Sequence, residues 1–264
     1  MIDLRAKAKE LNLFDANCFF GPVSRPQPES FETPADLLAE MDRLGIAEAL
    51  AYHADARWHS PAHGNELLLR ETASQPRLHA CWVLLPPEAR ALSEPERLVE
   101  EMIGRGVRAA RMFPREHRFV ISEWCVGALA RALAEARMPL FLDFDRRHWA
   151  EDVVPWDQVA ALCEAHPRLP VVLVHESFGS LNYLCALMAR HQNLMIETSY
   201  FVAHDGIQEI CTRYGPERLL FGTAMPTYEG GGPIGNLTLS GVSEETRRCV
   251  AGDNLRRLLE GVGR

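Results

Sequence analysis

The sequence lacks several features that would define its class at once. No apolar run approaches the roughly 18 residues of a membrane span, so no membrane partner is expected. Lys and Arg number 28 against 36 Asp and Glu, giving a net charge of −8, and no basic stripe suits nucleic acid. The first residues mix both charges, unlike a signal or transit peptide. These absences predict a cytoplasmic protein without a nucleic-acid partner.

Motifs of several enzyme classes are also missing. The seven cysteines form no CxxC pair, which predicts reduced thiols instead of disulfides or a zinc knuckle. No glycine-rich phosphate loop follows the first predicted strand, which counts against dinucleotide binding. The segment 176–179 lacks the first glycine of a Gly-x-Ser-x-Gly elbow, so a serine hydrolase is a poor interpretation. His53, His59 and His63 do not match the spacing of a helical zinc-binding pair.

Short apolar runs alternate along the chain with amphipathic stretches, a pattern typical of repeated βα units around a parallel sheet. Strands are predicted at 13–21, 46–53, 78–86, 107–114, 139–145, 171–177, 194–200 and 219–226. Helices are predicted at about 34–44, 64–75, 93–104, 121–137, 155–166, 179–191, 204–215 and 243–261. Over 264 residues, this pattern favours a single (β/α)8 TIM-barrel domain spanning 1–264, although an open doubly wound sheet fits the same alternation.

Three segments carry further patterns in chain order. Phe14–Gly21 reads Phe-Asp-Ala-Asn-Cys-Phe-Phe-Gly, Val171–His175 is an apolar strand that ends in histidine, and Leu219–Pro226 contains Gly-Thr-Ala-Met-Pro. They resemble, respectively, the Asp-x-His-x-His-x-Gly strand, a histidine-ended strand, and the Gly-Thr-Asp-x-Pro strand of the amidohydrolase-related family (amidohydrolase 2). This family includes metal-dependent hydrolases, decarboxylases and lactonases, and the resemblance implies an amidohydrolase-like (β/α)8 barrel.

The family's metal-binding positions are altered in this chain. The two first-strand histidines correspond to Asn17 and Phe19, the last-strand aspartate to Ala224, and a fifth-strand histidine to Asp143. A catalytic zinc generally takes three protein ligands from His, Asp, Glu or Cys. Phenylalanine and alanine supply no lone pair, so the sequence predicts a degenerate metal site and no cofactor.

A rearranged zinc site is the less favoured alternative. It would combine Asp143, His175 and Cys18. Strand alternation, however, turns Cys18 away from the side that Asn17 and Phe19 face.

Polar residues are predicted near the carboxyl ends of the strands, where TIM-barrel active sites lie. His175 closes an apolar strand at a family position and is predicted to act as a general acid or base, together with Asp143. Asn17 and Arg111 are predicted to hold carboxylate or carbonyl oxygens. The alternative for Arg111 is an internal ion pair with Asp15 or Asp143.

Further substrate contacts are predicted from three residues at strand ends. His53 closes the second predicted strand, and Thr198 and Tyr200 lie at the end of the seventh. The segment 230–233, Gly-Gly-Gly-Pro, is predicted to be a flexible surface loop or a lid beside the last strand.

Three functional hypotheses follow from these observations. The leading one is a metal-independent hydrolase of this family that acts on a small carboxylated, lactone-like substrate, with His175 and Asp143 moving protons and Arg111 and Asn17 binding oxygens. The second is a catalytically inactive barrel that binds a ligand or a partner. The third is a zinc hydrolase or decarboxylase with displaced ligands. The resemblance also makes a homo-oligomer plausible.

Overall fold

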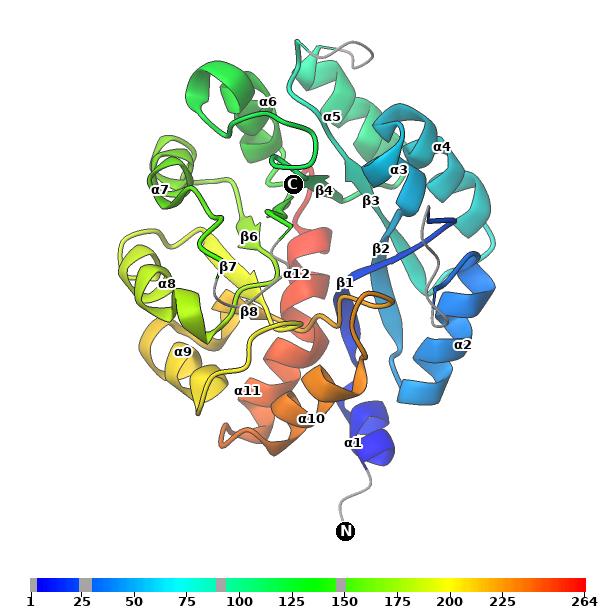
Figure 1. Cartoon of the computed structure of the whole chain (residues 1–264), viewed down its shortest axis with the longest axis vertical. Helices are drawn as coiled ribbons and strands as arrows, with labels where there is room; N and C mark the ends of the chain where they lie inside the picture. The colour runs from blue at the N-terminus through cyan, green and yellow to red at the C-terminus, as the bar shows by residue number, and fades with distance from the viewer. Residues whose placement is uncertain (1–3, 24–29, 89–93, 146–150) are drawn as a thin grey trace.

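Eight parallel strands form the frame of the computed structural model, which describes residues 4–23, 30–88, 94–145 and 151–264 (Figure 1). Each strand pairs with the next one in the chain. The strands are β1 (Phe14–Phe20), β2 (Glu48–His53), β3 (Leu78–Val83), β4 (Ala109–Met112), β5 (Leu140–Leu142), β6 (Val171–Leu173), β7 (Leu194–Glu197) and β8 (Leu219–Leu220). The predicted (β/α)8 TIM barrel is confirmed.

Backbone hydrogen bonds bring the last strand region back to the first. Ala16 N donates to Phe221 O at 2.8 Å, and Ala224 N donates to Asn17 O at 2.7 Å. Phe19 N also donates to Met225 O at 3.0 Å. The sheet therefore returns on itself, and the residues after β8 face those of β1.

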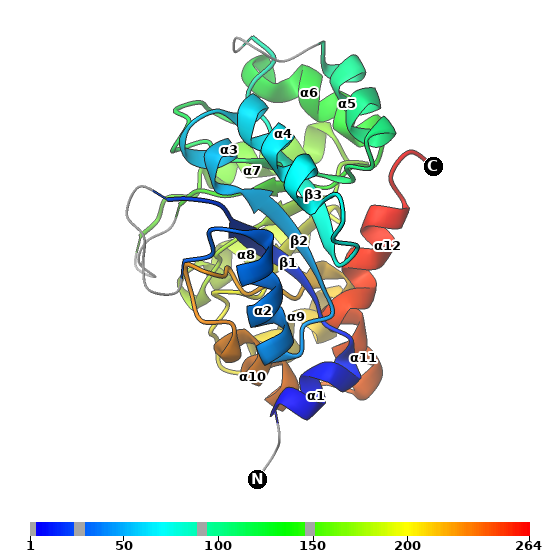
Figure 2. The same ribbon diagram turned by 90° about the vertical axis from the view of Figure 1, so that its right-hand side faces the viewer.

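Helices surround the strands (Figures 1 and 2). They are α1 (Leu4–Leu11), α2 (Pro34–Leu44), α3 (Ala54–Trp58), α4 (Pro61–Thr72), α5 (Pro95–Gly104), α6 (Glu123–Glu135), α7 (Trp156–Ala165), α8 (Leu181–Met188), α9 (Gly206–Tyr214), α10 (Gly231–Leu239), α11 (Glu244–Arg248) and α12 (Asn254–Glu260). Short 3-10 turns lie at Phe178–Ser180 and Pro216–Arg218. No helix within the described ranges has both the length and the apolar character needed to cross a membrane.

Local sequence signals account for the best-predicted helix. The Thr33 hydroxyl accepts the backbone N–H of Asp36, whose carboxylate in turn accepts the N–H of Thr33, so a capping box begins α2. Gly45 ends the helix with a φ of 79°, a conformation that glycine adopts without steric cost. These two signals are local, which explains why the prediction for 34–44 is confirmed.

Other elements differ from the prediction. The glycine-rich segment predicted to be a loop or lid instead begins α10, because Ile234 and Leu237 bury their side chains against the core. The residues after β2 form the five-residue helix α3, too short to show a helical period in the sequence. The last predicted helix, 243–261, is divided by a π-helical turn at Cys249–Asp253.

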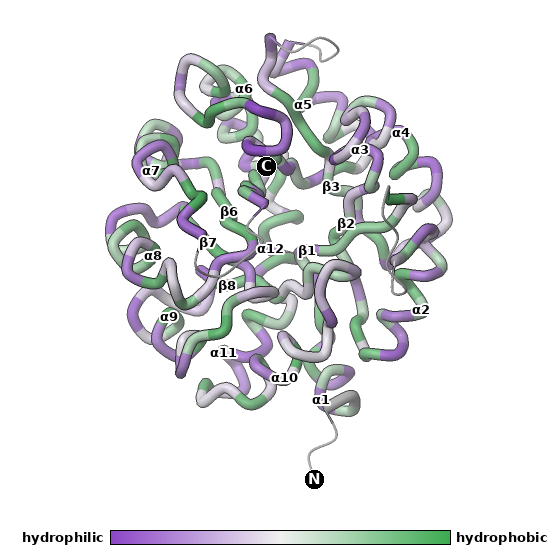
Figure 3. Tube along the Cα trace, viewed as in Figure 1, coloured by the Kyte–Doolittle hydropathy of each residue, from purple (hydrophilic) through white to green (hydrophobic). Residues whose placement is uncertain are grey.

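The core has two layers, and the hydrophobic colouring in Figure 3 follows the central strands. An outer layer lies between strands and helices, with Leu37 and Met102 fully buried in it. An inner layer fills the barrel and includes Phe14, Phe141 and other strand residues. Leu255 of α12 belongs to this inner layer, so α12 closes the amino-terminal end of the barrel. The opposite end holds buried polar residues beside a third, smaller apolar cluster that includes Phe19, Tyr52 and Phe113.

Strand β1 contains an irregularity that decides which side chains face inward. Asp15 pairs with Ala49, but Cys18 pairs with Ala51, so the register shifts between Asp15 and Cys18. Ala16 lies in the inner layer, whereas Cys18 lies in the outer one, as expected. Bulges of this kind re-aim side chains and are common beside active sites.

Candidate active site

Five buried polar residues meet inside the barrel towards the carboxyl ends of the strands. This polar centre consists of Asn17, Arg111, Asp143, His175 and Glu197. Arg111, Asp143 and Glu197 each come two residues after a member of the inner layer. These inner-layer residues are Ala109, Phe141 and Met195. Side chains two positions apart along a strand face the same side. The strands therefore carry an apolar floor and, above it, a polar layer.

Asn17 lies between the other members of the polar centre. Its Oδ1 accepts from Arg111 Nη1 at 2.9 Å, and its Nδ2 lies 3.3 Å from Glu197 Oε1. A guanidinium only donates and a carboxylate only accepts, so these neighbours fix the orientation of the amide. The same Nδ2 lies 3.1 Å from His175 Nε2. A neutral His175 ring therefore accepts at Nε2 and carries its proton on Nδ1.

His175 and Asp143 form an ion pair, with Nδ1 3.4 Å from Oδ1. Burial lowers the pKa of His175, but the Asp143 carboxylate outweighs this effect, and the pKa is raised above its ordinary value. Burial likewise raises the pKa of Asp143, but His175, Arg57 and Arg111 hold it well below its usual range. The pair can thus hold a proton on the ring opposite a stable carboxylate.

Arg111 places a permanent positive charge in the polar centre. Its Nη1 lies 3.4 Å from Asp143 Oδ2, and its Cζ lies 4.8 Å from the centre of the Tyr52 ring. Of the two ion pairs considered from the sequence, the one with Asp143 is present. Asp15 is occupied elsewhere: its Oδ1 accepts Thr223 N at 3.0 Å, and its Oδ2 accepts the Thr223 hydroxyl. Burial raises the pKa of Asp15 to about 7.

Two of the predicted substrate contacts lie away from the polar centre. His53 accepts Asp55 N at Nδ1 over 3.1 Å, and its ring packs against Phe20. The Thr198 hydroxyl accepts Gly222 N at 3.3 Å. Both side chains follow inward-facing residues by one position, so strand alternation turns them outward.

Tyr200, the third predicted contact, approaches the polar centre through another residue. Its ring stacks on Tyr228, with the ring centres 5.1 Å apart. The Tyr228 ring in turn presents an edge to His175 at 6.0 Å. Sequence reasoning missed Tyr228 because it lies in the segment after β8, where no strand period places it.

The two remaining family metal positions lie beside the polar centre. The Phe19 ring packs against Tyr52 at 5.2 Å and Trp58 at 5.3 Å. Ala224 adopts a φ of 58°, a left-handed conformation that is uncommon for alanine. Neither side chain offers a metal ligand.

Sequence reasoning also missed Glu197 and Arg57. Glu197 had a readable signal, because it follows the apolar Met195 by two positions on β7. Arg57 lies in α3 and is buried, with Nε 2.6 Å from Glu116 and Nη2 2.8 Å from Asp145. No strand or helix was predicted there, so nothing indicated which way its side chain would turn.

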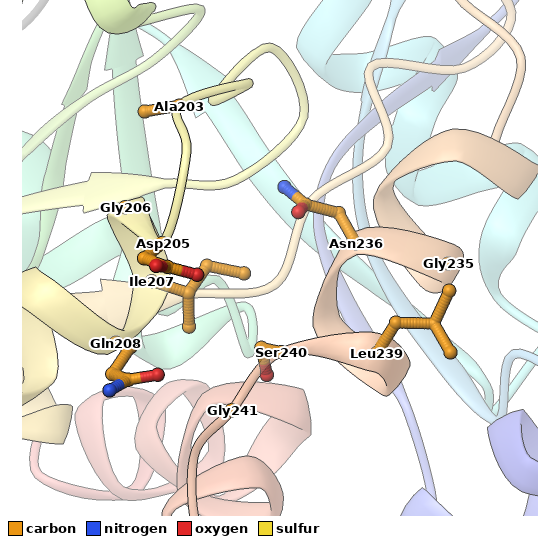
Figure 4. A pocket seen from close by; sticks show the side chains of 10 residues that line it. All are labelled: Ala203, Asp205, Gly206, Ile207, Gln208, Gly235, Asn236, Leu239, Ser240 and Gly241. Atoms are coloured by element: carbon orange, nitrogen blue, oxygen red, sulfur yellow. The ribbon is translucent and has the colours of Figure 1, made fainter.

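A separate pocket of about 230 Å³ lies between α9 and α10 (Figure 4). Gln208, Asn236 and Ser240 are among the residues that line it. It contains no member of the polar centre.

The family model described as "Amidohydrolase" matches residues 16–261. The chain belongs to the amidohydrolase family. A search of curated protein sequences found no match.

Solved structures share the fold at low sequence identity. A 5-carboxyvanillate decarboxylase from Novosphingobium aromaticivorans, complexed with manganese and 4-hydroxy-3-methoxy-5-nitrobenzoic acid, is 13% identical with a TM-score of 0.76, over 96% of this chain and 97% of that one. A dihydroxybenzoic acid decarboxylase from Polaromonas sp. JS666, with manganese and 2-nitroresorcinol, is 14% identical with a TM-score of 0.71, over 94% and 97%. A candidate 2-pyrone-4,6-dicarboxylic acid hydrolase from Pseudomonas putida is 17% identical with a TM-score of 0.65, over 95% and 98%.

The manganese in two of these neighbours contradicts the prediction that no cofactor is involved, because it suggests a metal cofactor for proteins of this kind. Among the described residues, however, no group of three His, Cys, Asp or Glu side chains is arranged to hold a metal ion. In addition, Arg111 Nη1 lies within 3.4 Å of both Asn17 Oδ1 and Asp143 Oδ2, side chains at two of the family's ligand positions. The described residues therefore do not fit a three-ligand metal site.

Proposed function

We propose that this amidohydrolase-family chain is an enzyme that opens a lactone-like ester in a small carboxylated substrate. The observation that carries this proposal is the line from Asp143 through His175 to Asn17, with His175 Nδ1 facing the carboxylate and Nε2 facing the amide. One structural neighbour is a candidate 2-pyrone-4,6-dicarboxylic acid hydrolase, whose substrate is both a lactone and a carboxylic acid.

The proposed reaction uses His175 as a base and then as an acid. His175 Nε2 takes a proton from water, and the water oxygen forms a bond to the ester carbonyl carbon. The C–O bond of the lactone breaks, and the leaving oxygen takes the proton back from Nε2. Asp143 stabilises the imidazolium in between, as a carboxylate does in other His-Asp pairs. Water therefore adds across the ester, and no atom or charge is left over.

Asn17 and Arg111 are proposed to bind substrate oxygens. The Arg111 guanidinium suits a carboxylate or the oxyanion that forms on the carbonyl oxygen. In the free protein, Asn17 Nδ2 faces His175 Nε2, but Glu197 Oε1 lies within 3.3 Å and Ser199 Oγ within 3.5 Å. When a water molecule or substrate replaces the Asn17 amide beside the His175 ring, the amide can still donate to Glu197 or Ser199.

Decarboxylation is the second candidate function. It is favoured by the raised pKa of His175, which keeps a proton on the ring for donation. In that reaction the C–C bond to the carboxylate breaks, CO2 leaves, and the electron pair left on carbon takes the proton from His175. Two of the reported neighbours are decarboxylases of aromatic acids.

The experiment that tests the proposal compares substrates and variants. The purified protein, with and without added manganese, is incubated with 2-pyrone-4,6-dicarboxylate, simpler carboxylated lactones and dihydroxybenzoates. We expect ring opening without CO2 release, and a loss of at least ~10²-fold in kcat for His175→Asn. His204→Asn is the matched control, since this side chain is 97% exposed, and we expect activity within about twofold of the unchanged chain.

The other outcomes separate the remaining hypotheses. Release of CO2 would favour decarboxylation. Binding of these compounds at the barrel mouth without any turnover would favour an inactive ligand-binding barrel, the second hypothesis from the sequence.

A further inference from the structure

The carboxylate of Glu197 contacts two members of the polar centre but has no part in the steps proposed above. We propose that Glu197 is a positioning residue, which holds the Asn17 amide and the His175 backbone in the geometry through which both act. The effect of Glu197 on catalysis rests on the proposed function, but its effect on the positions of Asn17 and His175 can be measured separately.

Glu197 is fully buried and accepts hydrogen bonds at both oxygens. Oε1 accepts His175 N at 2.8 Å, the Ser199 hydroxyl at 2.7 Å and Asn17 Nδ2 at 3.3 Å, while Oε2 accepts Ser199 N at 2.7 Å. A buried carboxylate is costly unless donors surround it, and these four contacts supply them. Because only an acceptor can meet all four donors, the side chain is suited to this place as a carboxylate.

The contact with His175 acts on the backbone. His175 has a φ of 60°, a left-handed conformation that is uncommon for a residue with a side chain. Its N–H donates to Glu197 Oε1, which ties this conformation to β7. The same conformation directs the ring towards Asp143. Glu197 therefore influences the ring through the peptide.

Gly222, after β8, leaves the space that Glu197 occupies. A Cβ atom at this position would lie 2.2 Å from Glu197 Oε2 and 3.3 Å from the Cβ of Asn17. No side chain can enter without moving the carboxylate. The arrangement thus depends on β1, β7 and the residues after β8 together.

Glu197→Gln tests the inference because it keeps the size of the side chain but replaces one acceptor oxygen by an NH2 group. At least one of the N–H or O–H groups that now donate to Glu197 then faces the new NH2 group instead of an acceptor. Glu48→Gln is the matched control: Glu48 pairs with Arg256 and His79, both at 2.8 Å, and lies at the start of β2, at the other end of the barrel.

The first readout is the proton NMR signal of the His175 Nδ1–H, assigned by its disappearance in His175→Asn. We expect this signal to shift or vanish in Glu197→Gln and to stay in place in Glu48→Gln. The second readout is kcat/KM, which we expect to fall by ~10–10²-fold in Glu197→Gln, because small displacements of reacting groups have effects of this size. Gly222→Ala keeps every polar group and presses mainly on the carboxylate, which would lie 2.2 Å from the added Cβ, so we expect the same changes.

An unchanged ring signal in both Glu197→Gln and Gly222→Ala would overturn the inference. If the unchanged chain converts none of the substrates but its ring signal moves in these two variants, the proposed function fails while the positioning role stands.

Discussion

The Nδ1 atom of His175 lies 3.4 Å from Oδ1 of Asp143, and the two residues lie within two positions of the carboxyl ends of the paired strands β6 and β5. Adjacent parallel strands end at the same edge of a sheet, so their following residues can meet without a long connection. A carboxylate behind an imidazole orients the ring and stabilises its charged form. The pH dependence of activity therefore depends on this pair.

Asp143→Asn removes the carboxylate that raises the pKa of His175. Hydrolysis uses the neutral ring as the base, so activity of the unchanged chain rises as the pH increases through this raised pKa. In the variant we expect the rise at lower pH, and a maximal kcat that is ~10²-fold smaller because asparagine does not stabilise the imidazolium. The kcat of both proteins as a function of pH measures this. A rise at the same pH in both would mean that His175 is not the titrating group.

Asp15→Asn tests the influence of a buried acid on stability. Burial raises the pKa of folded Asp15 to about 7, whereas an unfolded Asp titrates near 3.8. The folded state therefore holds this proton more tightly, and the resulting stability is present below about pH 4 and lost as the pH rises through about 7, by up to ~4 kcal/mol. We expect the free energy of unfolding of Asp15→Asn to be flatter over this range.

The amide introduced by Asp15→Asn would still accept from two backbone N–H groups and could donate to the Thr223 hydroxyl, the groups that Asp15 contacts now. Urea unfolding at about pH 4, 5.5 and 7.5 gives the comparison. Equal pH dependence of the unfolding free energy in both proteins would contradict the prediction.

Restoring the family's ligands is expected to strengthen manganese binding. In the combined variant Asn17→His, Phe19→His and Ala224→Asp, two imidazoles and a carboxylate enter the barrel mouth. The φ of 58° at Ala224 is less unfavourable for aspartate than for alanine. We expect at least ~tenfold tighter binding than in the unchanged chain, since added anionic and imidazole ligands raise affinity. Equilibrium dialysis of both chelator-treated proteins measures it. Equal affinities would contradict the prediction that these three positions can supply manganese ligands.

Arg57→Met is expected to destabilise the fold by ~3 kcal/mol, because it removes a buried cation that pairs with two carboxylates. Arg57 contacts Glu116 and Asp145, and its Cζ lies 4.7 Å from the Trp58 ring. Arg105→Met is the matched control. Arg105 also pairs with a carboxylate and lies 5.3 Å from the ring of Trp82, but its side chain is 34% exposed.

For Arg105→Met we expect a loss below about 1 kcal/mol, as for other exposed ion pairs. Thermal and urea unfolding of the two variants give the free energies. Similar losses at both positions would show that burial does not determine the contribution of Arg57.

The fold could be predicted further than the site, and particular residues show why. Thr33 and Gly45 mark the ends of α2 by local contacts alone, and apolar periodicity located all eight strands. The glycines at the start of α10 led to the prediction of a loop, although packing of the later residues stabilises a helix there. Strand lengths were overestimated because the predicted strands continued through residues such as Asp143 and His175, which lie beyond the last residues of β5 and β6.

For the site, the sequence indicated Asn17, Arg111, Asp143 and His175, and the structure brings these four together. The sequence did not indicate that Glu197 on β7 lies close to Asn17 on β1. His53 lies away from these four residues because it follows the inward-facing Tyr52 by one position, and successive side chains of a strand turn to opposite faces. The chemical roles of the four residues stay predictions.

The register shift in β1 has a chemical consequence. Phe14 and Ala16 face the inside of the barrel, so strict alternation would next bring Cys18 inward and turn Asn17 towards the helices. The shift reverses that choice, and Asn17 meets Arg111 and His175 while the Cys18 thiol is buried in the outer layer. One extra residue in a strand thus decides whether the barrel presents an amide or an oxidisable, nucleophilic sulfur to whatever enters it.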